Sequence, residues 1–105
     1  MSIMVGPYTF EGPFTTVDEF KEHPGLYAIH CYKDDRYYLI DVGQSATLKS
    51  CLAHHDRKTC WRHNCRNELS FAIHYTPALS EEERVRIEHV IRKQYITIPC
   101  GDVNE

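Results

Sequence analysis

The stretch YYLIDVGQSATLKSCLAHH, residues 37–55, predicts a strand that passes through a glycine turn into a helix. Its first residues are aromatic or branched, as is typical of strands, and Gly43 permits the turn. Ser45 is a candidate N-cap, after which residues recur at the spacing of one helix face. These are Leu48, Cys51, Leu52 and His55. Asp41 ends the strand. We expect its carboxylate to be exposed at a cleft, bonded to turn amides or close to a metal, because burying it unpaired is costly.

Segments on both sides of this stretch predict an antiparallel sheet with helices packed on it. GLYAIHCY and RYYLIDVG flank the polar loop KDD and predict a hairpin, and LSFAIHYT alternates as a third strand. We therefore predict an α+β fold, in which helices flank a small three-stranded antiparallel sheet. The predicted strands cover residues 25–32, 36–42 and 69–76, and a helix at 80–95 packs across them.

Other segments carry weaker signals. YTFEGPF predicts only a short edge strand, because Gly12 and Pro13 break it. Thr16 has capping-box spacing to Glu19 and begins a short predicted helix. Ser80 and Glu83 have the same spacing and begin the longer helix at 80–95. RKTCWRHN predicts a second short helix or a loop, held in place by its tryptophan.

Length and composition bound the classes of protein to consider. The 105 residues are 42% hydrophobic and 26% charged, which predicts a single domain over residues 1–105. No apolar run approaches the roughly 20 residues of a membrane span. The N-terminus lacks the basic and apolar regions of a secretory signal. We therefore expect a cytoplasmic protein with no membrane partner. Its five cysteines, an odd number, then favour reduced thiols over a disulfide framework.

Charge is unevenly distributed along the chain. The net charge of −3 argues against a protein that binds nucleic acid through its whole surface. Residues 49–66 nevertheless carry five cations against the single anion Asp56. The cations are Lys49, Arg57, Lys58, Arg62 and Arg66. A solvated face and a phosphate-binding face both fit this segment.

The same segment is rich in residue types that ligate metals. They are Cys51, His54, Cys60, His63 and Cys65. The Cys60-x-x-His63 spacing is tolerable for zinc, but the segment has no paired Cys-x-x-Cys knuckle. Buried free cysteines and surface histidines are therefore favoured over a structural zinc site.

Five short motifs occur in an order that resembles the GIY-YIG nuclease family. They are Gly25-Leu26-Tyr27, Asp41-Val42-Gly43, His55-Asp56-Arg57, Cys60-Trp61 and Pro99-Cys100-Gly101. The resemblance covers residues 24–104 and is greatest to a small bacterial branch with an Asp-Val-Gly second motif. It implies an endonuclease that hydrolyses nucleic-acid phosphodiesters with an activated water and one divalent metal, Mg²⁺ or Mn²⁺.

The resemblance also implies roles for individual residues. Tyr27 and His55 match positions that handle protons, and Glu88 matches the carboxylate that holds the metal. Asp41 stands where the family has its second catalytic tyrosine, and it assists or replaces that group. A polar substrate contact near the C-terminus matches Asn104. We add as substrate contacts the basic residues Arg57, Lys58 and Arg62 of the cationic segment.

Two positions depart from the family pattern. Asp41 replaces the second tyrosine, and Cys51 stands where an arginine steadies the phosphate through two oxygens. Cysteine cannot do this, so we expect weak cleavage or none unless Arg57 or Arg62 supplies the charge. Two alternatives to the nuclease follow. One is an inactive member that binds nucleic acid or a protein partner, including a second copy of the chain. The other is a zinc-stabilised interaction domain.

Some candidate residues also have a purely structural interpretation. Tyr27 fits a core aromatic on a central strand as well as a site tyrosine. Glu88 lies on an amphipathic helix where a carboxylate needs a partner, and Arg84, one turn earlier, is a candidate. On the functional interpretation, one concave surface is expected to gather Tyr27, Asp41, His55 and Glu88, with Cys51 lining it.

Overall fold

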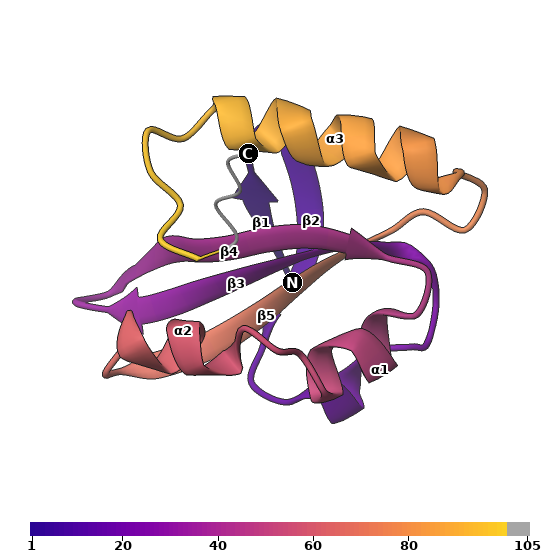
Figure 1. Cartoon of the computed structure of the whole chain (residues 1–105). Coiled ribbons are helices and arrows are strands. Elements are labelled where there is room, and N and C mark those ends of the chain that lie inside the picture. The colour runs from indigo at the N-terminus through magenta and orange to yellow at the C-terminus, as the bar shows by residue number, and fades with distance from the viewer. Residues whose placement is uncertain (101–105) are drawn as a thin grey trace.

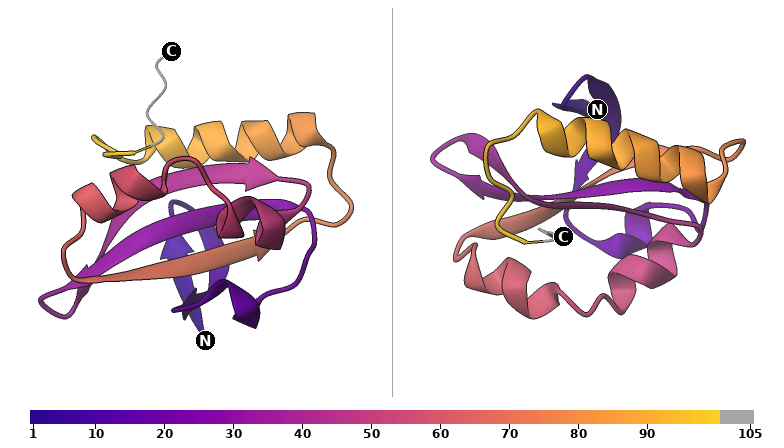
Figure 2. Two further views of the ribbon diagram at one scale, coloured as in Figure 1. Left: turned by 60° about the horizontal axis from the view of Figure 1, so that its bottom comes forward. Right: turned by 45° about the horizontal axis from the view of Figure 1, so that its top comes forward.

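A five-stranded antiparallel sheet organises the protein (Figure 1). The computed structural model describes residues 1–100. The strands are β1 (Ser2–Val5), β2 (Tyr8–Phe14), β3 (Gly25–Lys33), β4 (Arg36–Ser45) and β5 (Glu68–Tyr75). Their order in the sheet is β1-β2-β5-β3-β4. The helical segments are the 3₁₀ turn η1 (Val17–Glu19) and the helices α1 (Leu48–Ala53), α2 (Lys58–His63) and α3 (Glu81–Lys93). Helix α3 covers one face of the sheet, and α1 and α2 cover the other (Figure 2).

The prediction of a three-stranded sheet was wrong, although the class is α+β. Strands β3, β4 and β5 occupy the predicted segments, but β1 and β2 extend the sheet beyond β5. The β2–β5 ladder has a register shift between Glu11 and Phe14, and this irregularity accommodates Gly12 and Pro13. Strand β1 then takes the edge position that we predicted for β2. The hairpin adds to the core because Phe10 is fully buried.

Side-chain caps explain where two helical segments begin. Ser80 Oγ accepts the Glu83 backbone N–H, and the Glu83 carboxylate accepts the Ser80 N–H, so α3 starts with a complete capping box. At the other predicted start, Thr16 Oγ1 accepts the Asp18 N–H. Only the single 3₁₀ turn η1 follows there, because the chain is extended again at Phe20.

Two hydrophobic clusters cover the two faces of the sheet. Strand β3 lies between β5 and β4, and its residues alternate between the clusters. Tyr27 and Ile29 belong to the cluster under α1 and α2, which includes Leu48, Leu52 and Trp61. Leu26 and Ala28 belong to the cluster under α3, which includes Val42 and Ile91. Because β3 is buried on both faces, the backbone that carries Tyr27 is held firmly in position.

Irregular geometry in β4 aims Asp41 toward α2. Ile29 pairs with Asp41 and His30 pairs with Leu39, so Ile40 is an extra residue and the register shifts there. Ile40 packs in the cluster under α1 and α2, and Asp41 bonds to Trp61 of α2. Without the bulge, Ile40 and Asp41 would point to opposite faces of the sheet, as consecutive strand residues do.

Two disulfides join segments that are distant in the sequence. Cys31 of β3 is bonded to Cys65, and Cys60 of α2 is bonded to Cys100. The expectation of reduced thiols without a disulfide framework is therefore contradicted. The argument from the odd number of cysteines was wrong because four of the five cysteines form disulfides and only Cys51 stays free.

The disulfides also remove the basis for a zinc site. Cys60 and Cys65 were two of its candidate ligands, and both are oxidised. Within residues 1–100, no three histidine, cysteine or acidic side chains gather where they could hold a metal ion. No helix in this same range has the length and apolar character needed to cross a membrane.

Candidate functional site

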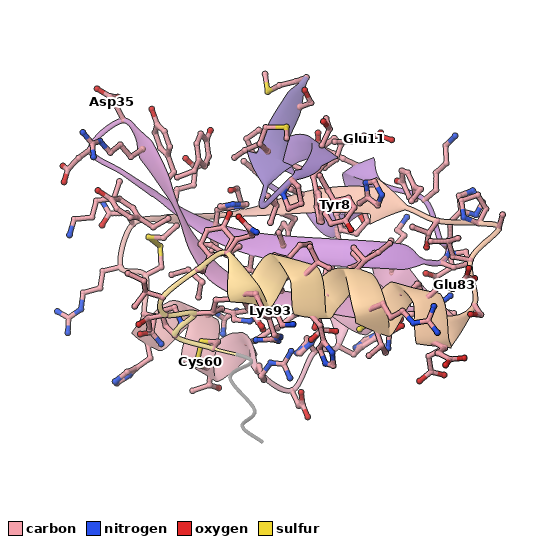
Figure 3. All side chains as sticks on the ribbon, turned by 90° about the horizontal axis from the view of Figure 1, so that it is seen from above. Tyr8, Glu11, Asp35, Cys60, Glu83 and Lys93 are labelled. Atoms are coloured by element: carbon pink, nitrogen blue, oxygen red, sulfur yellow. A yellow bond between two sulfur atoms is a disulfide. The ribbon has the colours of Figure 1, made fainter. Side chains whose placement is uncertain are left out.

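A cleft of about 280 Å³ crosses the edge of the sheet at β4. Its walls are formed by Tyr27, Gly43, Gln44, Cys51, His55, Asp56, Arg57, Glu88 and Arg92. One wall belongs to the α1–α2 side of the sheet, and α3 provides the other. Figure 3 shows α3 lying along β4, with Glu83 and Lys93 labelled near its two ends. The fold thus gathers residues of the neighbouring strands β3 and β4 and of the helices α1 and α3 at one place.

Tyr27, His55 and Arg57 form a hydrogen-bonded cluster on the first wall. The Tyr27 hydroxyl oxygen lies 2.7 Å from His55 Nε2. Arg57 Nη2 donates to the same oxygen at 2.9 Å. Gly43 is paired with Tyr27 across the β3–β4 ladder, and a Cβ at this position would collide with the tyrosine hydroxyl. The absence of a side chain at Gly43 therefore lets the tyrosine reach the cluster.

Hydrogen bonds around His55 determine where its proton lies. Asp56 Oδ1 lies 3.3 Å from His55 Nδ1, but the Arg57 backbone N–H donates to the same nitrogen at 3.1 Å. We therefore assign the proton of the neutral imidazole to Nε2. Nε2–H then donates to the Tyr27 oxygen, which also accepts from the Arg57 guanidinium. Because two donors already approach that oxygen, the Tyr27 O–H proton is left to donate into the cleft.

Burial and charge set the protonation states of this pair. Burial and the nearby Arg57 charge lower the pKa of His55 below its ordinary value. Burial and the Asp41 charge raise the pKa of Tyr27, and Arg57 opposes this only in part. At neutral pH, His55 is therefore uncharged and Tyr27 keeps its proton. Both side chains present N–H or O–H donors, and neither is a good base in this arrangement.

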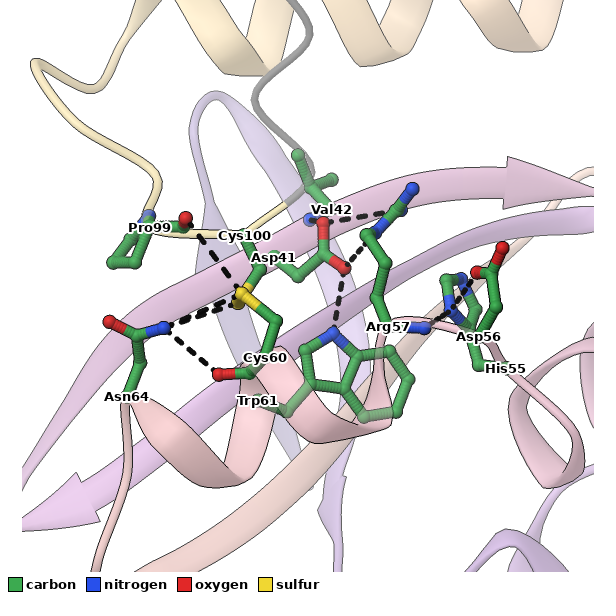
Figure 4. Close-up of a disulfide and its surroundings, with 10 residues drawn as sticks. All are labelled: Asp41, Val42, His55, Asp56, Arg57, Cys60, Trp61, Asn64, Pro99 and Cys100. Carbon is green, nitrogen blue, oxygen red and sulfur yellow. Dashed lines mark hydrogen bonds and ion pairs between the residues drawn. A yellow bond between two sulfur atoms is a disulfide. The ribbon is translucent and has the colours of Figure 1, made fainter.

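Asp41 lies beneath the cleft, fully buried, and does not line it. Its carboxylate accepts Arg57 Nε at 2.9 Å, Trp61 Nε1 at 2.7 Å and the Val42 N–H at 2.8 Å (Figure 4). The expectation of an exposed carboxylate was wrong, although its bond to a backbone amide was foreseen. Three donors satisfy the buried charge, and in return Asp41 fixes the position of the Arg57 side chain.

Glu88 lines the opposite wall, but its carboxylate is already paired. It accepts Arg92 Nε at 2.9 Å, and both side chains are mostly buried. The expected partner Arg84 bonds elsewhere. Among residues 1–100, the only other carboxylate on the cleft wall is that of Asp56, which is 93% exposed. Magnesium is commonly held by one or two free carboxylates together with substrate phosphates. The donors present here, with Glu88 neutralised by Arg92, do not fit such a metal.

The remaining sequence candidates lie at different distances from the cleft. Arg57 and Cys51 both line it. The cleft therefore contains the guanidinium of Arg57 as well as the thiol at the position where the resemblance implies an arginine. The Lys58 ammonium donates to the Ala53 carbonyl and thereby caps α1. Arg62 is exposed on α2 and is not part of the cleft wall. Asn104 lies outside the described residues.

Contacts join the motifs that carry the family resemblance. Asp41 connects the second motif to Arg57 and Trp61. The Cys60–Cys100 disulfide connects the residue before Trp61 to the C-terminal motif. The Cys100 N–H in turn donates to the Ile40 carbonyl at 2.8 Å, next to Asp41. One residue or more of each motif within residues 1–100 thus belongs to a continuous network under the first wall.

Four residues of the cleft wall, Gly43, Gln44, Asp56 and Arg92, were not among the predicted site residues. Gly43 and Asp56 were named only as members of the motifs. The four-residue spacing between Glu88 and Arg92 was a usable signal for their ion pair. Gln44 follows directly after the glycine turn, and no signal in the neighbouring sequence indicated that it is a site residue.

Comparisons with known proteins leave the family open. No family model matches the chain, and neither the curated proteins nor the solved structures include a significant match.

Proposed function

We propose that this chain is a GIY-YIG-like domain that binds a nucleic-acid phosphodiester in the cleft without efficient hydrolysis. The observation that carries the proposal is the Tyr27 hydroxyl, held between His55 and Arg57 with its own proton free for a ligand. Neighbouring donors on a rigid strand suit the oxygens of a phosphate. The site is preorganised, because Asp41 and Gly43 fix the side chains that form it.

Arg57 supplies the positive charge that Cys51 lacks. Its Nε donates to Asp41 and its Nη2 to Tyr27 and, at 3.4 Å, to Asp41, while Nη1 makes no hydrogen bond among residues 1–100. A guanidinium has five N–H donors, so this side chain keeps capacity for an anionic oxygen. Its neighbour Asp41 offsets part of the charge, which favours modest and salt-sensitive affinity.

The second candidate function is a weak endonuclease that uses Mg²⁺ or Mn²⁺. It is favoured by the meeting of Tyr27, His55 and Glu88 in one cleft, as the family resemblance implies. Three features oppose it: Glu88 is paired with Arg92, Tyr27 is a poor base, and His55 directs N–H toward the tyrosine. A cytoplasmic location stays a prediction, and disulfides are more typical of oxidising compartments.

Electrophoresis with plasmid DNA and structured RNA separates the two functions. The chains compared are the wild type, Cys51→Arg and Cys51→Arg/Glu88→Ala, each with Mg²⁺, Mn²⁺ or a chelator. We expect retarded bands that weaken with salt, and no cleavage product from the wild type. Metal-dependent product that disappears with Glu88→Ala would support the endonuclease instead. Absence of both retardation and product would contradict both functions.

A further inference from the structure

Gln44 and Arg84 form a pair at the second wall of the cleft. Gln44 follows Gly43 in β4 and pairs with Leu26, whose side chain belongs to the cluster under α3. Successive strand residues point to opposite faces, so Gln44 approaches the cleft from the α3 side. Arg84 Nε, in the first turns of α3, donates to Gln44 Oε1 at 2.9 Å.

The Arg84 guanidinium determines which end of the Gln44 amide faces which way. Guanidinium groups only donate hydrogen bonds, so the amide atom beside Arg84 has to be the oxygen. The amide nitrogen is then the end that is free of Arg84, and it makes no hydrogen bond among residues 1–100. Because Gln44 lines the cleft, a ligand there meets an –NH₂ group with two donors.

Among the residues that the structure describes, no carboxylate contacts Arg84 to balance its charge. It is only 6% exposed. Besides Gln44 it bonds to the Leu79 carbonyl, at 3.2 Å from Nη1, and it forms no ion pair in the described part of the chain. A buried cation bonded to neutral acceptors favours a nearby anion. It also polarises the Gln44 amide, which strengthens the donors at the opposite end.

We propose that Gln44 contacts a phosphate oxygen of the bound nucleic acid through its amide N–H donors, and that Arg84 is the positioning residue that holds this amide. The inference rests on the proposed function, because it places the phosphate in the same cleft. Tyr27 and Arg57 line the same cleft from its first wall, so the phosphate is held from both walls.

Gln44→Glu is the sharpest variant. One carboxylate oxygen keeps the place of Oε1 and forms an ion pair with Arg84, so the fold is retained. The other oxygen replaces the –NH₂ group with an acceptor that repels phosphate. Gln94→Glu is the matched control, since it makes the same charge change at an exposed position at the end of α3. The probe is a fluorescein-labelled single-stranded DNA oligonucleotide, titrated by fluorescence anisotropy.

We expect Gln44→Glu to raise the dissociation constant about tenfold or more, and Gln94→Glu to change it less than twofold. Equal effects of the two variants, with the wild type binding, would overturn the inference and leave the proposed function standing. A wild type that does not bind the probe would overturn both.

A double-mutant cycle tests the positioning role of Arg84. Arg84→Met is measured in the wild type and in the Gln44→Leu background, and thermal melts check that each variant is folded. If Arg84 acts through Gln44, its substitution weakens binding several-fold in the first background and far less in the second. Arg84→Lys keeps a donor and a charge, and it is expected to restore part of the binding. Equal losses in both backgrounds would show that Arg84 is merely structural.

Discussion

At the scale of single residues, Gly43 and Asp41 decide how the cleft is arranged. Gly43 leaves the space that the Tyr27 hydroxyl occupies. Asp41 holds Arg57 from below, so that the guanidinium can donate to the same hydroxyl. The sequence marked both positions as part of a turn motif, but Asp41 was expected at the surface. Its burial depends on two partners in the following segment, Arg57 and Trp61, and no local pattern reveals such contacts.

Gly43→Ala is expected to disrupt the cluster by direct collision. The added methyl group would displace the Tyr27 ring from His55, at a cost of about 1–3 kcal/mol in the free energy of unfolding. Urea denaturation, followed by the fluorescence of the single tryptophan, measures this cost. Oligonucleotide binding should weaken in parallel. Wild-type stability and affinity in the variant would show that the tyrosine does not depend on this glycine.

At the scale of elements, the α2 segment is secured from several sides. Trp61 packs in the core and donates to Asp41, while Cys60, its neighbour, is bonded to Cys100. The sequence located this helix only as a helix or loop, because six residues are too few for a clear periodic pattern. Its position is set by the disulfide and by the tryptophan, both of which are long-range contacts.

Loss of the Cys60–Cys100 disulfide should loosen this helix. Cys60→Ser/Cys100→Ser is expected to lower the free energy of unfolding by about 2–4 kcal/mol, because the unfolded chain regains the entropy of a long loop. Thermal melts with and without a dithiol reductant provide the measurement. Cys51→Ser is the matched control and should melt like the wild type. If the double variant melts at the wild-type temperature and reductant has no effect, this disulfide does not support the fold.

At the scale of the whole molecule, local signals predicted the β3–β4 hairpin, strand β5 and helix α3. Their capping boxes and alternating patterns depend on neighbouring residues only. Strand β1 was missed, and β2 was predicted only as a short edge strand outside the three-stranded sheet, because Gly12 and Pro13 interrupt it. The place of β2 depends on pairing with the distant β5, and β1 pairs with β2. A count of cysteines likewise could not predict which cysteines form disulfides. Among the site candidates, the chain order of the motifs led to Tyr27, His55 and Glu88, whereas their hydrogen-bond partners came only from the structure.

Global stability should depend on pH through a buried histidine. Burial lowers the pKa of His30 to about 4, and its Nδ1 has no hydrogen-bond partner among residues 1–100. Between pH 6.5 and 4 the unfolded chain binds a proton at this residue that the folded chain does not. The free energy of unfolding therefore falls as pH decreases through this range, by about 3 kcal/mol from His30. The lowered pKa of His55 acts in the same direction.

Urea titrations at several pH values measure this dependence, with His30→Leu as the comparison. The variant removes the group that titrates, so its stability should decline less steeply toward pH 4. Parallel curves for the two chains would assign the acid sensitivity to other groups.

The central claim is that the Tyr27 hydroxyl donates to a nucleic-acid phosphate in the cleft, and one measurement tests it most directly. It is a fluorescence-anisotropy titration of labelled single-stranded DNA and RNA with the wild type, Tyr27→Phe and Tyr38→Phe. Tyr27→Phe keeps the ring and removes the hydroxyl, while Tyr38→Phe makes the same change at a residue that is 46% exposed outside the cleft wall. We predict salt-sensitive binding by the wild type and by Tyr38→Phe, and affinity about tenfold weaker for Tyr27→Phe. Failure of the wild type to bind either probe, or equal affinity for Tyr27→Phe, would contradict the account.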